Sequence, residues 1–468
     1  MTSAGSSAAT RLGSNGERGV AVDSVGIIAL HAFACVLARQ AGFDHVSDDD
    51  FSRVTIAQAF AHAPKLDPSG TSWLPFPFWI LGSAMAVLGR SLDVAHAVSV
   101  LFASVAATTP CLALRLGGIP RARALFATAF AFVTPWCIWL GAATVPESFT
   151  ASFTAAGAIG LAAYCQRDRD SAGFVHPPHE GRAHGTRRLP ILIALAITAA
   201  CLSRYDAWPV AAVLAVCLVV SALQESDRRG LLLGLAAICV LGPLVWIAWN
   251  AHAHDGPLHF FRRVARFKQA SGEGATDTWS ALVLYPGLLF TTRPEVAIPA
   301  LFLLPALRDS TVRRRWAIPL LCAAAQVAFL AYGNVRDGAP THHPERALLG
   351  ALLLLALFVG DVGLTKLAEL AQDGRSLTAK GGAAVFALAW IISSVRGADP
   401  PGQGPSEDRR EQIARGEKLR AIRARSILIT PCAFEHFALI AAYGAPENAE
   451  TKPRSGAFSA ECPDVQVR

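Results

Sequence analysis

The stretch "HVSDDDFSRVTIAQAFAHAPKLDPSGTSWLPFPFW", from His45 to Trp79, decides how this chain is folded. It places three consecutive aspartates, Asp48, Asp49 and Asp50, after an apolar N-terminal segment, and it ends in a run of prolines and aromatic residues. If that run crosses a membrane, every later loop changes sides. The composition of the whole chain indicates that such a membrane is present.

The chain of 468 residues is 53% hydrophobic and only 16% charged, whereas soluble domains carry about 25% charged residues. Its mean hydropathy is +0.38. Apolar runs long enough to span a hydrocarbon core of roughly 30 Å recur along it, and they lack the alternation of a transmembrane β-barrel. We therefore expect an all-α polytopic membrane protein. Arginines at the cytoplasmic ends of spans account for most of the net charge of +7, so the charge predicts no nucleic acid partner.

We expect about eleven transmembrane helices. By residue number they are 25–41, 94–114, 124–141, 149–165, 190–203, 209–223, 231–250, 296–307, 316–332, 346–365 and 382–396. The apolar stretch 73–89 is ambiguous. If it crossed fully, the basic loops would alternate onto the wrong side; if it dips in or lies at the interface, they all become cytoplasmic. We therefore expect it not to cross, and the same reasoning predicts that 279–290 does not span by itself.

This topology divides the chain into four parts. They are a cytoplasmic tail (1–24), a transmembrane domain (25–396) with a long first outward loop (42–93), a small C-terminal extracytoplasmic unit (397–445) and a disordered tail (446–468). The pattern in the C-terminal unit predicts a helix, a short buried strand and a second helix. Cys432 and Cys462 could form a disulfide if this region is extracytoplasmic.

Ionisable residues gather at the outward ends of the spans. Besides the three aspartates they occur in "ATVPESF", "LSRYDAWP" and "THHPER", and they are Glu147, Arg204, Asp206, His342, His343, Glu345 and Arg346. A single cluster of this kind can simply anchor a helix at the interface. Several clusters on one face, with acids beside arginines, predict a shared polar cavity.

Such a cavity suits sugar transfer from a polyprenyl-phosphate carrier. A carboxylate in the first outward loop can accept the proton of an attacking hydroxyl or amine. Arginines at the membrane boundary can bind a lipid-linked phosphate and neutralise it as it leaves. The sugar would lie just outside the bilayer, while its lipid tail stays among the spans.

The chain resembles membrane glycosyltransferases of the GT-C superfold, a group that includes protein O-mannosyltransferases and lipid A aminoarabinose transferases. "SDDDFSR" stands where that family has an acidic motif, and "WLPFPFWILG" stands where it has a proline-aromatic run of the type H-P-P-L-x-Y-W. "TVPESF", "SRYDAWP" and "HHPERALLGALLLL" resemble its later motifs, in the family's order. The family often has Asp-Glu at the acidic site, and here its histidine is missing and Ala347 replaces a tyrosine. The likeness covers about residues 25–365.

The resemblance implies a GT-C type bundle and a role for each matching residue. The general base is Asp49 or else Asp50, beside Asp48, and Glu147 positions the acceptor or a metal, or stabilises the first loop. Arg204 and Arg346 bind the donor phosphate. Asp206 and Glu345 orient these two arginines, and Tyr205 and His343 are supporting residues. In "HFFRRVARFKQ", Arg262, Arg263 or Arg266 covers the lipid phosphate, unless this segment is only an interfacial amphipathic helix.

The sequence requires no metal or other cofactor. Some members of the superfold use a divalent ion, which Asp50 and Glu147 would hold here. The resemblance implies a bacterial inner (plasma) membrane with a periplasmic active site, a polyprenyl-phosphate sugar as donor, and a protein, lipid or glycan as acceptor. The sugar, the acceptor and the oligomeric state stay open.

Two other functions fit a chain of this kind. A transporter or lipid-linked sugar flippase would place charged or broken segments near the membrane midplane, often in repeated halves. The acids and arginines here lie at one face, and no internal repeat is apparent. A non-catalytic assembly partner that kept the fold would tolerate the loss of the aspartate triplet.

Overall fold

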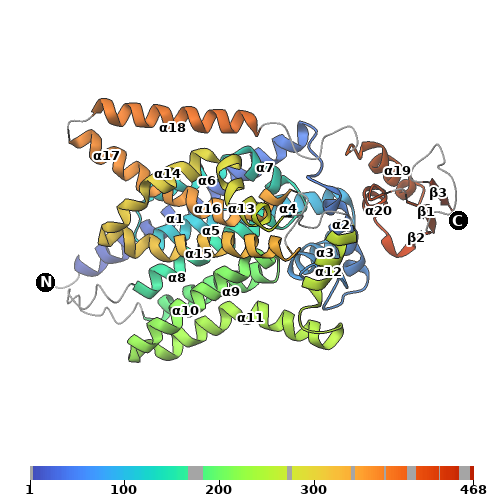
Figure 1. Ribbon diagram of the computed structural model, residues 1–468, viewed down its shortest axis with the longest axis horizontal. Helices are drawn as coiled ribbons and strands as arrows, with labels where there is room; N and C mark the ends of the chain where they lie inside the picture. The colour runs from blue at the N-terminus through green and yellow to red at the C-terminus, as the bar shows by residue number, and fades with distance from the viewer. Residues whose placement is uncertain are drawn as a thin grey trace.

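The computed structural model describes residues 4–166, 183–270, 277–338, 343–373, 376–397, 407–431, 433–452 and 464–467. The chain forms a helical bundle with a small mixed unit at one end, and its N-terminus lies at the opposite end (Figure 1). The predicted features at His342, Cys432 and Cys462 fall outside the described residues.

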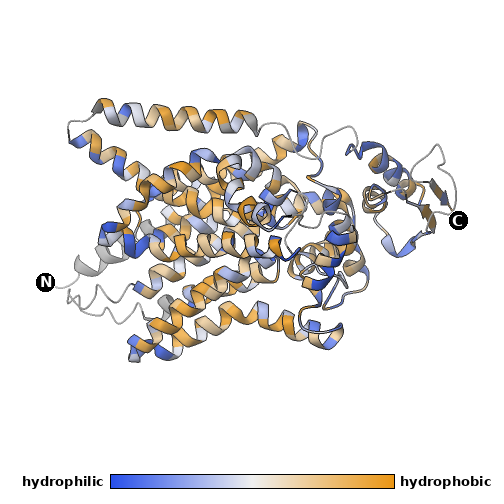
Figure 2. Ribbon diagram, viewed as in Figure 1, coloured by the Kyte–Doolittle hydropathy of each residue, from blue (hydrophilic) through white to orange (hydrophobic). Residues whose placement is uncertain are grey.

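Long apolar helices form the body of the bundle, and polar residues gather toward its two ends (Figure 2). Within the described ranges, seven segments are long and apolar enough to cross a membrane. Five of them are built on α1 (Ala4–Gln40), α8 (Glu147–Gln166), α10 (Trp208–Gln224), α11 (Arg229–Ala253) and α15 (Ser310–Val335). Two are composite: α4 (Leu92–Ala106) with α5 (Thr108–Leu116), and α16 (Leu349–Phe358) with α17 (Leu364–Gln372) through the π-helical turn Val359–Gly363.

Two further spans are broken, which raises the count in the described part of the chain to nine. The helices α6 (Arg121–Phe132) and α7 (Pro135–Ala142) meet at 75°, and the segment of α14 (Pro294–Leu303) meets α13 (Thr278–Thr292) at 101°. In each pair a proline begins the second helix, where its missing N–H and fixed φ are tolerated. Nη1 of Arg293 lies 3.4 Å from Oγ1 of Thr134, so the two breaks meet inside the bundle.

The remaining predicted spans coincide with α9 (Ala183–Cys201) and α18 (Ser376–Arg396), whose apolar parts are shorter. Every span predicted from the sequence therefore falls on helical structure. The prediction of an all-α polytopic membrane protein is confirmed.

The segment 73–89 does not form a long span. Only Phe76–Leu88 is helical there (α3), and its 13 residues extend about 20 Å, which is short of the hydrocarbon core. It packs closely on α2 (Asp48–His62) because Gly82 has no side chain: a Cβ at this position would lie 2.8 Å from the carbonyl oxygen of Ala57. The first loop is thus a helical layer over one end of the bundle.

The C-terminal unit lies beside this layer (Figure 1). It contains α19 (Arg410–Ala421), α20 (His436–Tyr443) and a three-stranded sheet in the order β2-β1-β3. The central strand β1 (Ile427–Thr430) pairs parallel with β2 (Ala449–Thr451) and antiparallel with β3 (Asp464–Val467). The helix α20 also packs on α2, where Nε2 of Gln58 donates to the carbonyl oxygen of Ala441 at 2.7 Å.

The prediction that 446–468 is a disordered tail was wrong for the described parts of this segment. Both β2 and β3 lie within it and complete the sheet on either side of β1. Their described side chains are mostly exposed, and strand pairing uses backbone groups, so the sequence carries little apolar signal for them. The unit therefore extends beyond residue 445.

We predict that Gly82→Ala destabilises the purified protein. The added methyl group would meet the Ala57 carbonyl oxygen and the Phe60 ring, at 2.8 and 2.5 Å, and overpacking of this kind costs about 1–3 kcal/mol. The thermal unfolding midpoint in detergent measures the effect. The matched control is Gly234→Ala on α11, where a Cβ would meet nothing within 4 Å, so that midpoint should stay or rise slightly. Equal midpoints for both variants would contradict the close α2–α3 contact.

Candidate functional site

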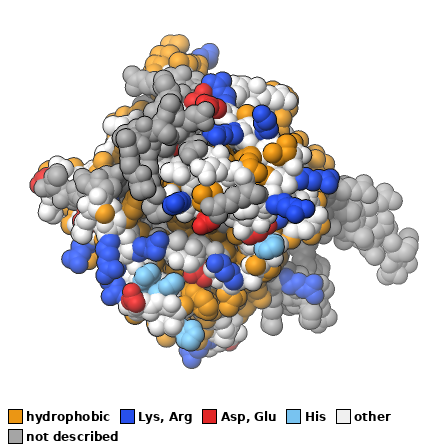
Figure 3. Space-filling model, turned by 90° about the vertical axis from the view of Figure 1, so that its right-hand side faces the viewer, with side chains coloured by type: hydrophobic (Ala, Val, Ile, Leu, Met, Phe, Trp, Pro, Cys, Tyr) orange, Lys and Arg blue, Asp and Glu red, His pale blue; other side chains and the backbone are white. Residues whose placement is uncertain are grey.

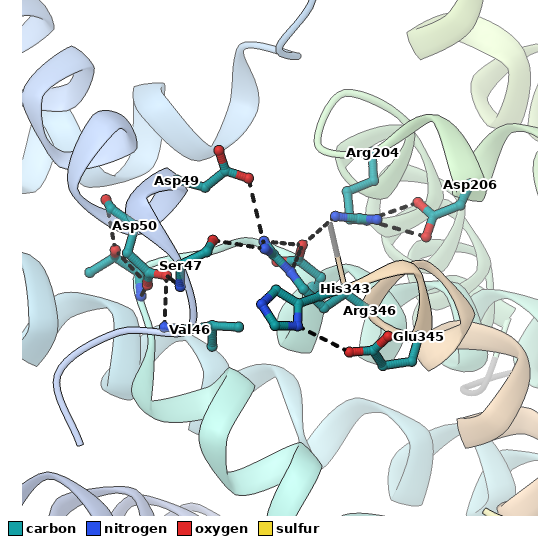
Figure 4. Close-up of polar contacts among 11 residues, drawn as sticks. Val46, Ser47, Asp49, Asp50, Arg204, Asp206, His343, Glu345 and Arg346 are labelled. Atoms are coloured by element: carbon teal, nitrogen blue, oxygen red, sulfur yellow. Dashed lines mark hydrogen bonds and ion pairs between the residues drawn. The ribbon is translucent and has the colours of Figure 1, made fainter. Parts of the chain in front are cut away.

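The predicted acids and arginines form one group of polar contacts (Figure 4), and the helix ends that carry them lie at the end of the bundle with the C-terminal unit (Figure 1). They come from the start of α2, the start of α8, the 3₁₀ turn Tyr205–Ala207 before α10 and the 3₁₀ turn Pro344–Leu348 before α16. Figure 3 views the molecule from this end and shows Lys and Arg side chains spread across the face, with acidic side chains between them.

Glu147 lies at the centre of this group. It is 1% exposed, and its Oε1 accepts hydrogen bonds from Nη1 of Arg204 and from Nε and Nη2 of Arg346, the last two at 3.0 and 2.7 Å. Nε of Arg204 also contacts both carboxylate oxygens of Asp206, at 3.1 and 3.2 Å. One carboxylate thus joins the turn before α10 to the turn before α16.

Arg346 extends the group to α2. Its Nη1 donates to Oγ of Ser47 at 3.1 Å and lies 3.7 Å from Oδ2 of Asp49. The Asp49 side chain is 46% exposed, and it accepts no hydrogen bond from the described residues. Its carboxylate is therefore open to solvent beside a buried guanidinium group.

Asp50, the next residue, is buried, and both of its carboxylate oxygens accept hydrogen bonds. Its Oδ2 accepts from the backbone N–H groups of Val46 and Ser47 at 3.1 and 3.2 Å, and its Oδ1 accepts from the N–H and hydroxyl of Thr144 at 2.8 and 3.1 Å. A carboxylate has about four acceptor positions, so these donors occupy it. Asp50 caps the start of α2 and ties that helix to the turn before α8.

Asp48 faces the C-terminal unit instead. Its two oxygens form a bidentate ion pair with Nε and Nη2 of Arg409, at 2.7 and 2.9 Å. The hydrogen bond to Asp48 raises the pKa of Arg409 above its usual value. The three aspartates therefore differ. Asp48 contacts the C-terminal unit, Asp49 presents its carboxylate to solvent, and Asp50 is a buried helix cap.

The predicted supporting residues lie around this group. Nδ1 of His343 lies 3.3 Å from Oε1 of Glu345, in the turn that carries Arg346. The hydroxyl of Tyr205 donates to the carbonyl oxygen of Ser72 at 2.6 Å, and its ring stacks on Phe260 with centroids 4.6 Å apart. Tyr205 therefore holds the first loop and α12 (His259–Ala270) at the border of the site.

Arg263 and Arg266 are exposed on α12. In the described structure neither pairs with an acid of the Glu147 group. The stack of Tyr205 on Phe260 brings their helix to the border of the site, but their predicted contact with a lipid phosphate stays a prediction.

Asp50 and Glu147 do not form a site for a divalent ion in this arrangement. Asp50 already accepts hydrogen bonds at both oxygens, and Glu147 faces two guanidinium groups that would repel a cation. Across the described residues, no group of three or more His, Cys, Asp or Glu side chains is arranged to hold a metal ion.

Sequence reasoning missed Arg53, one helical turn after Asp49 on α2. It is 8% exposed, and its guanidinium carbon lies 4.4 Å from the centre of the Trp73 ring. Burial lowers the pKa of Arg53 below its usual value, although the charges of Glu147 and Asp49 act against this. The spacing of four residues from Asp49 is the signal that could have identified it, because it places both side chains on one helix face.

No family model matches the chain, and no curated protein sequence matches it. Among solved structures it is similar to ArnT from Cupriavidus metallidurans bound to undecaprenyl phosphate, with a TM-score of 0.50 and 13% identity over 91% of this chain and 89% of that one. It is also similar to the archaeal oligosaccharyltransferase AglB from Archaeoglobus fulgidus, in complex with an inhibitory peptide and a dolichol-phosphate, with a TM-score of 0.42 and 12% identity over 85% and 58%. At this identity the likeness to ArnT shows the fold, so the expected GT-C type bundle is confirmed.

We predict that Asp50→Asn destabilises the protein and that Asp49→Asn does not. An asparagine at 50 would turn an NH₂ group toward donors that now meet a carboxylate oxygen, which costs about 1–3 kcal/mol. Asp49 is half exposed, and substitutions at such positions stay within about 0.5 kcal/mol. Thermal unfolding midpoints in detergent measure both. A lower midpoint for Asp49→Asn than for Asp50→Asn would reverse the assignment of cap and free carboxylate.

Proposed function

We propose that the protein transfers a sugar from a polyprenyl-phosphate carrier to an acceptor at the end of the bundle formed by α2, α3 and the C-terminal unit. One observation carries the proposal: the solvent-facing carboxylate of Asp49 lies 3.7 Å from Nη1 of Arg346. The reaction needs a base for the acceptor and a cation for the departing phosphate, and this pair supplies one of each. The shared fold adds support, because ArnT was solved with undecaprenyl phosphate bound.

In this proposal Asp49 is the general base. It takes the proton of an acceptor hydroxyl or amine, whose oxygen or nitrogen bonds to the anomeric carbon of the sugar. The bond from that carbon to the phosphate oxygen breaks at the same time, and its electron pair leaves with the polyprenyl phosphate. A single displacement of this kind inverts the anomeric configuration. Asp50 is a positioning residue, because its contacts hold the helix that presents Asp49.

Arg346 and Arg204 supply positive charge for the departing phosphate in this proposal. Glu147 holds both, and Asp206 fixes Arg204 from the other side. Cations that are fixed before the reaction stabilise developing negative charge without the cost of reorienting. Arg263 and Arg266 would approach the headgroup from α12 at the border of the site.

We assign this end of the bundle to the periplasmic side of a bacterial inner membrane. The assignment is supported by the opposite end, where the chain begins (Figure 1) and where short loops contain arginines. Two of these, Arg115 and Arg121, pair there with Asp23 at 3.1 and 2.6 Å. Excess arginine marks the cytoplasmic side of a polytopic protein.

We predict that Asp49→Asn abolishes sugar transfer while the variant stays folded. Loss of a general base lowers rates by about 10²–10⁴-fold. Purified protein is incubated with radiolabelled polyprenyl-phosphate sugars and membrane extract, and transferred label is counted. Asp408→Asn is the control, because Asp408 pairs with Arg410 on the C-terminal unit; its transfer should equal that of the wild type. Equal transfer by Asp49→Asn and the wild type would remove Asp49 from the mechanism.

A lipid-linked sugar flippase is the second candidate, and the broken spans favour it. Arg293 and Glu295, 5% and 2% exposed, form a buried ion pair at the break between α13 and α14, and broken helices often carry the substrate sites of transporters. The products distinguish the two functions. A flippase would move the labelled donor across a proteoliposome membrane and leave it intact, whereas a transferase releases its sugar to an acceptor.

A further inference from the structure

An apolar pocket adjoins the Glu147 group, between α2, α3, α4 and α8. Its walls include Leu81, Val98, Phe102 and Phe149, and Arg53 is its one charged side chain within the described residues. Val98 and Phe102 are half-buried, so the pocket is reached from the flank where α3 and α4 are exposed. The pocket thus has an apolar lining that includes a single buried cation.

The guanidinium group of Arg53 makes no hydrogen bond or ion pair with an acid within the described structure. Its Nε and Nη1 are buried and have no hydrogen-bond partner there, and it forms no ion pair with Glu147 or Asp49. The guanidinium carbon lies 4.4 and 5.9 Å from the ring centres of Trp73 and Phe78, and such a contact is worth about 0.5–2 kcal/mol. Glu147 and Asp49 favour the charged form from a distance, but the two buried donors stay unsatisfied, which is costly. An anion that accepts hydrogen bonds from them would complete the site.

The chemistry around this cation selects an amphiphilic ligand. A guanidinium group binds phosphate through parallel N–H donors, and the neighbouring walls are hydrocarbon and aromatic. A phosphate monoester of a long apolar alcohol satisfies both at once: its oxygens meet Arg53, and its first carbons meet the pocket. A free phosphate would satisfy only the cation.

We propose that Arg53 binds the phosphate of the polyprenyl donor and that the adjoining pocket holds the first carbons of its prenyl chain. This inference rests on the proposed function for the identity of the lipid. It also fits the reaction geometry. Side chains four residues apart on a helix lie about 5–6 Å apart at Cβ, which leaves room for the anomeric carbon between the base Asp49 and the phosphate on Arg53.

The test measures lipid binding separately from sugar transfer. Wild-type protein and the variants Arg53→Met and Arg53→Lys are titrated with undecaprenyl phosphate in detergent, and bound lipid is counted by native mass spectrometry. Loss of charge-assisted hydrogen bonds should weaken binding by Arg53→Met about 10- to 100-fold. Arg53→Lys should retain part of the affinity, because it keeps the charge but not the planar donor set. The exposed Arg410 provides the control Arg410→Met, which should bind like the wild type.

Two further measurements separate the role of the apolar pocket from that of Arg53. Inorganic phosphate should bind the wild type far more weakly than undecaprenyl phosphate; equal affinity would overturn the role of the apolar pocket. Unfolding midpoints without ligand show whether each variant is folded, and Arg53→Lys serves if Arg53→Met does not fold. Unchanged lipid affinity in a folded Arg53 variant would overturn the role of Arg53 alone. A wild type that binds no undecaprenyl phosphate would overturn the proposed function as well.

Discussion

The carboxylate of Glu147 accepts hydrogen bonds from two arginines that lie far apart in the sequence, and the geometry of the site follows from this contact. Arg204 comes from the turn before α10 and Arg346 from the turn before α16. All three side chains are largely buried. Loss of the Glu147 carboxylate would therefore leave two buried guanidinium groups without the acceptor that they share. Breaking a buried pair in this way costs about 3–5 kcal/mol. The contact therefore fixes where the later spans meet the first loop.

This constraint explains why neighbouring aspartates act differently. Arg346, held by Glu147, reaches Ser47 at the start of α2 and approaches Asp49. Asp50 anchors the same helix end to Thr144, a few residues before Glu147. The acid between Asp48 and Asp50 is left facing solvent, beside a fixed cation. A run of three acids at a helix start is also favoured by the helix dipole, so stability and the proposed chemistry both favour carboxylates here.

Much of the fold was predictable from the sequence because the hydrophobic effect and the positive-inside rule act on long segments. The apolar runs correctly predicted where the long helices lie, and α3 is as short as expected for a segment that does not cross by itself. The strands β2 and β3 were missed, because short edge strands with exposed side chains leave almost no apolar pattern. The breaks at Pro135 and Pro294 have a visible cause in sequence, but their angles depend on packing.

The candidate site was predictable in its members but not in its pairing. Sidedness brought Glu147, Arg204 and Arg346 to one end, whereas only the folded chain reveals that one carboxylate joins them. Nothing in "DDDFSR" distinguishes a capping Asp50 from a free Asp49, since the difference lies in the distant Thr144. Arg53 was overlooked because an arginine on an amphipathic helix is usually solvated, and its burial results from Trp73 and the packing of α3 on α2.

A structure of the protein in lipid nanodiscs with undecaprenyl phosphate, determined by electron cryomicroscopy, tests the central claim most directly. We expect phosphate density beside α2, at about 3 Å from the guanidinium group of Arg53 and on the same side as the Asp49 carboxylate. The prenyl chain should leave between α3 and α4. Phosphate density at the end of the bundle that carries the N-terminus, or an Asp49 far from Arg346, would contradict the account.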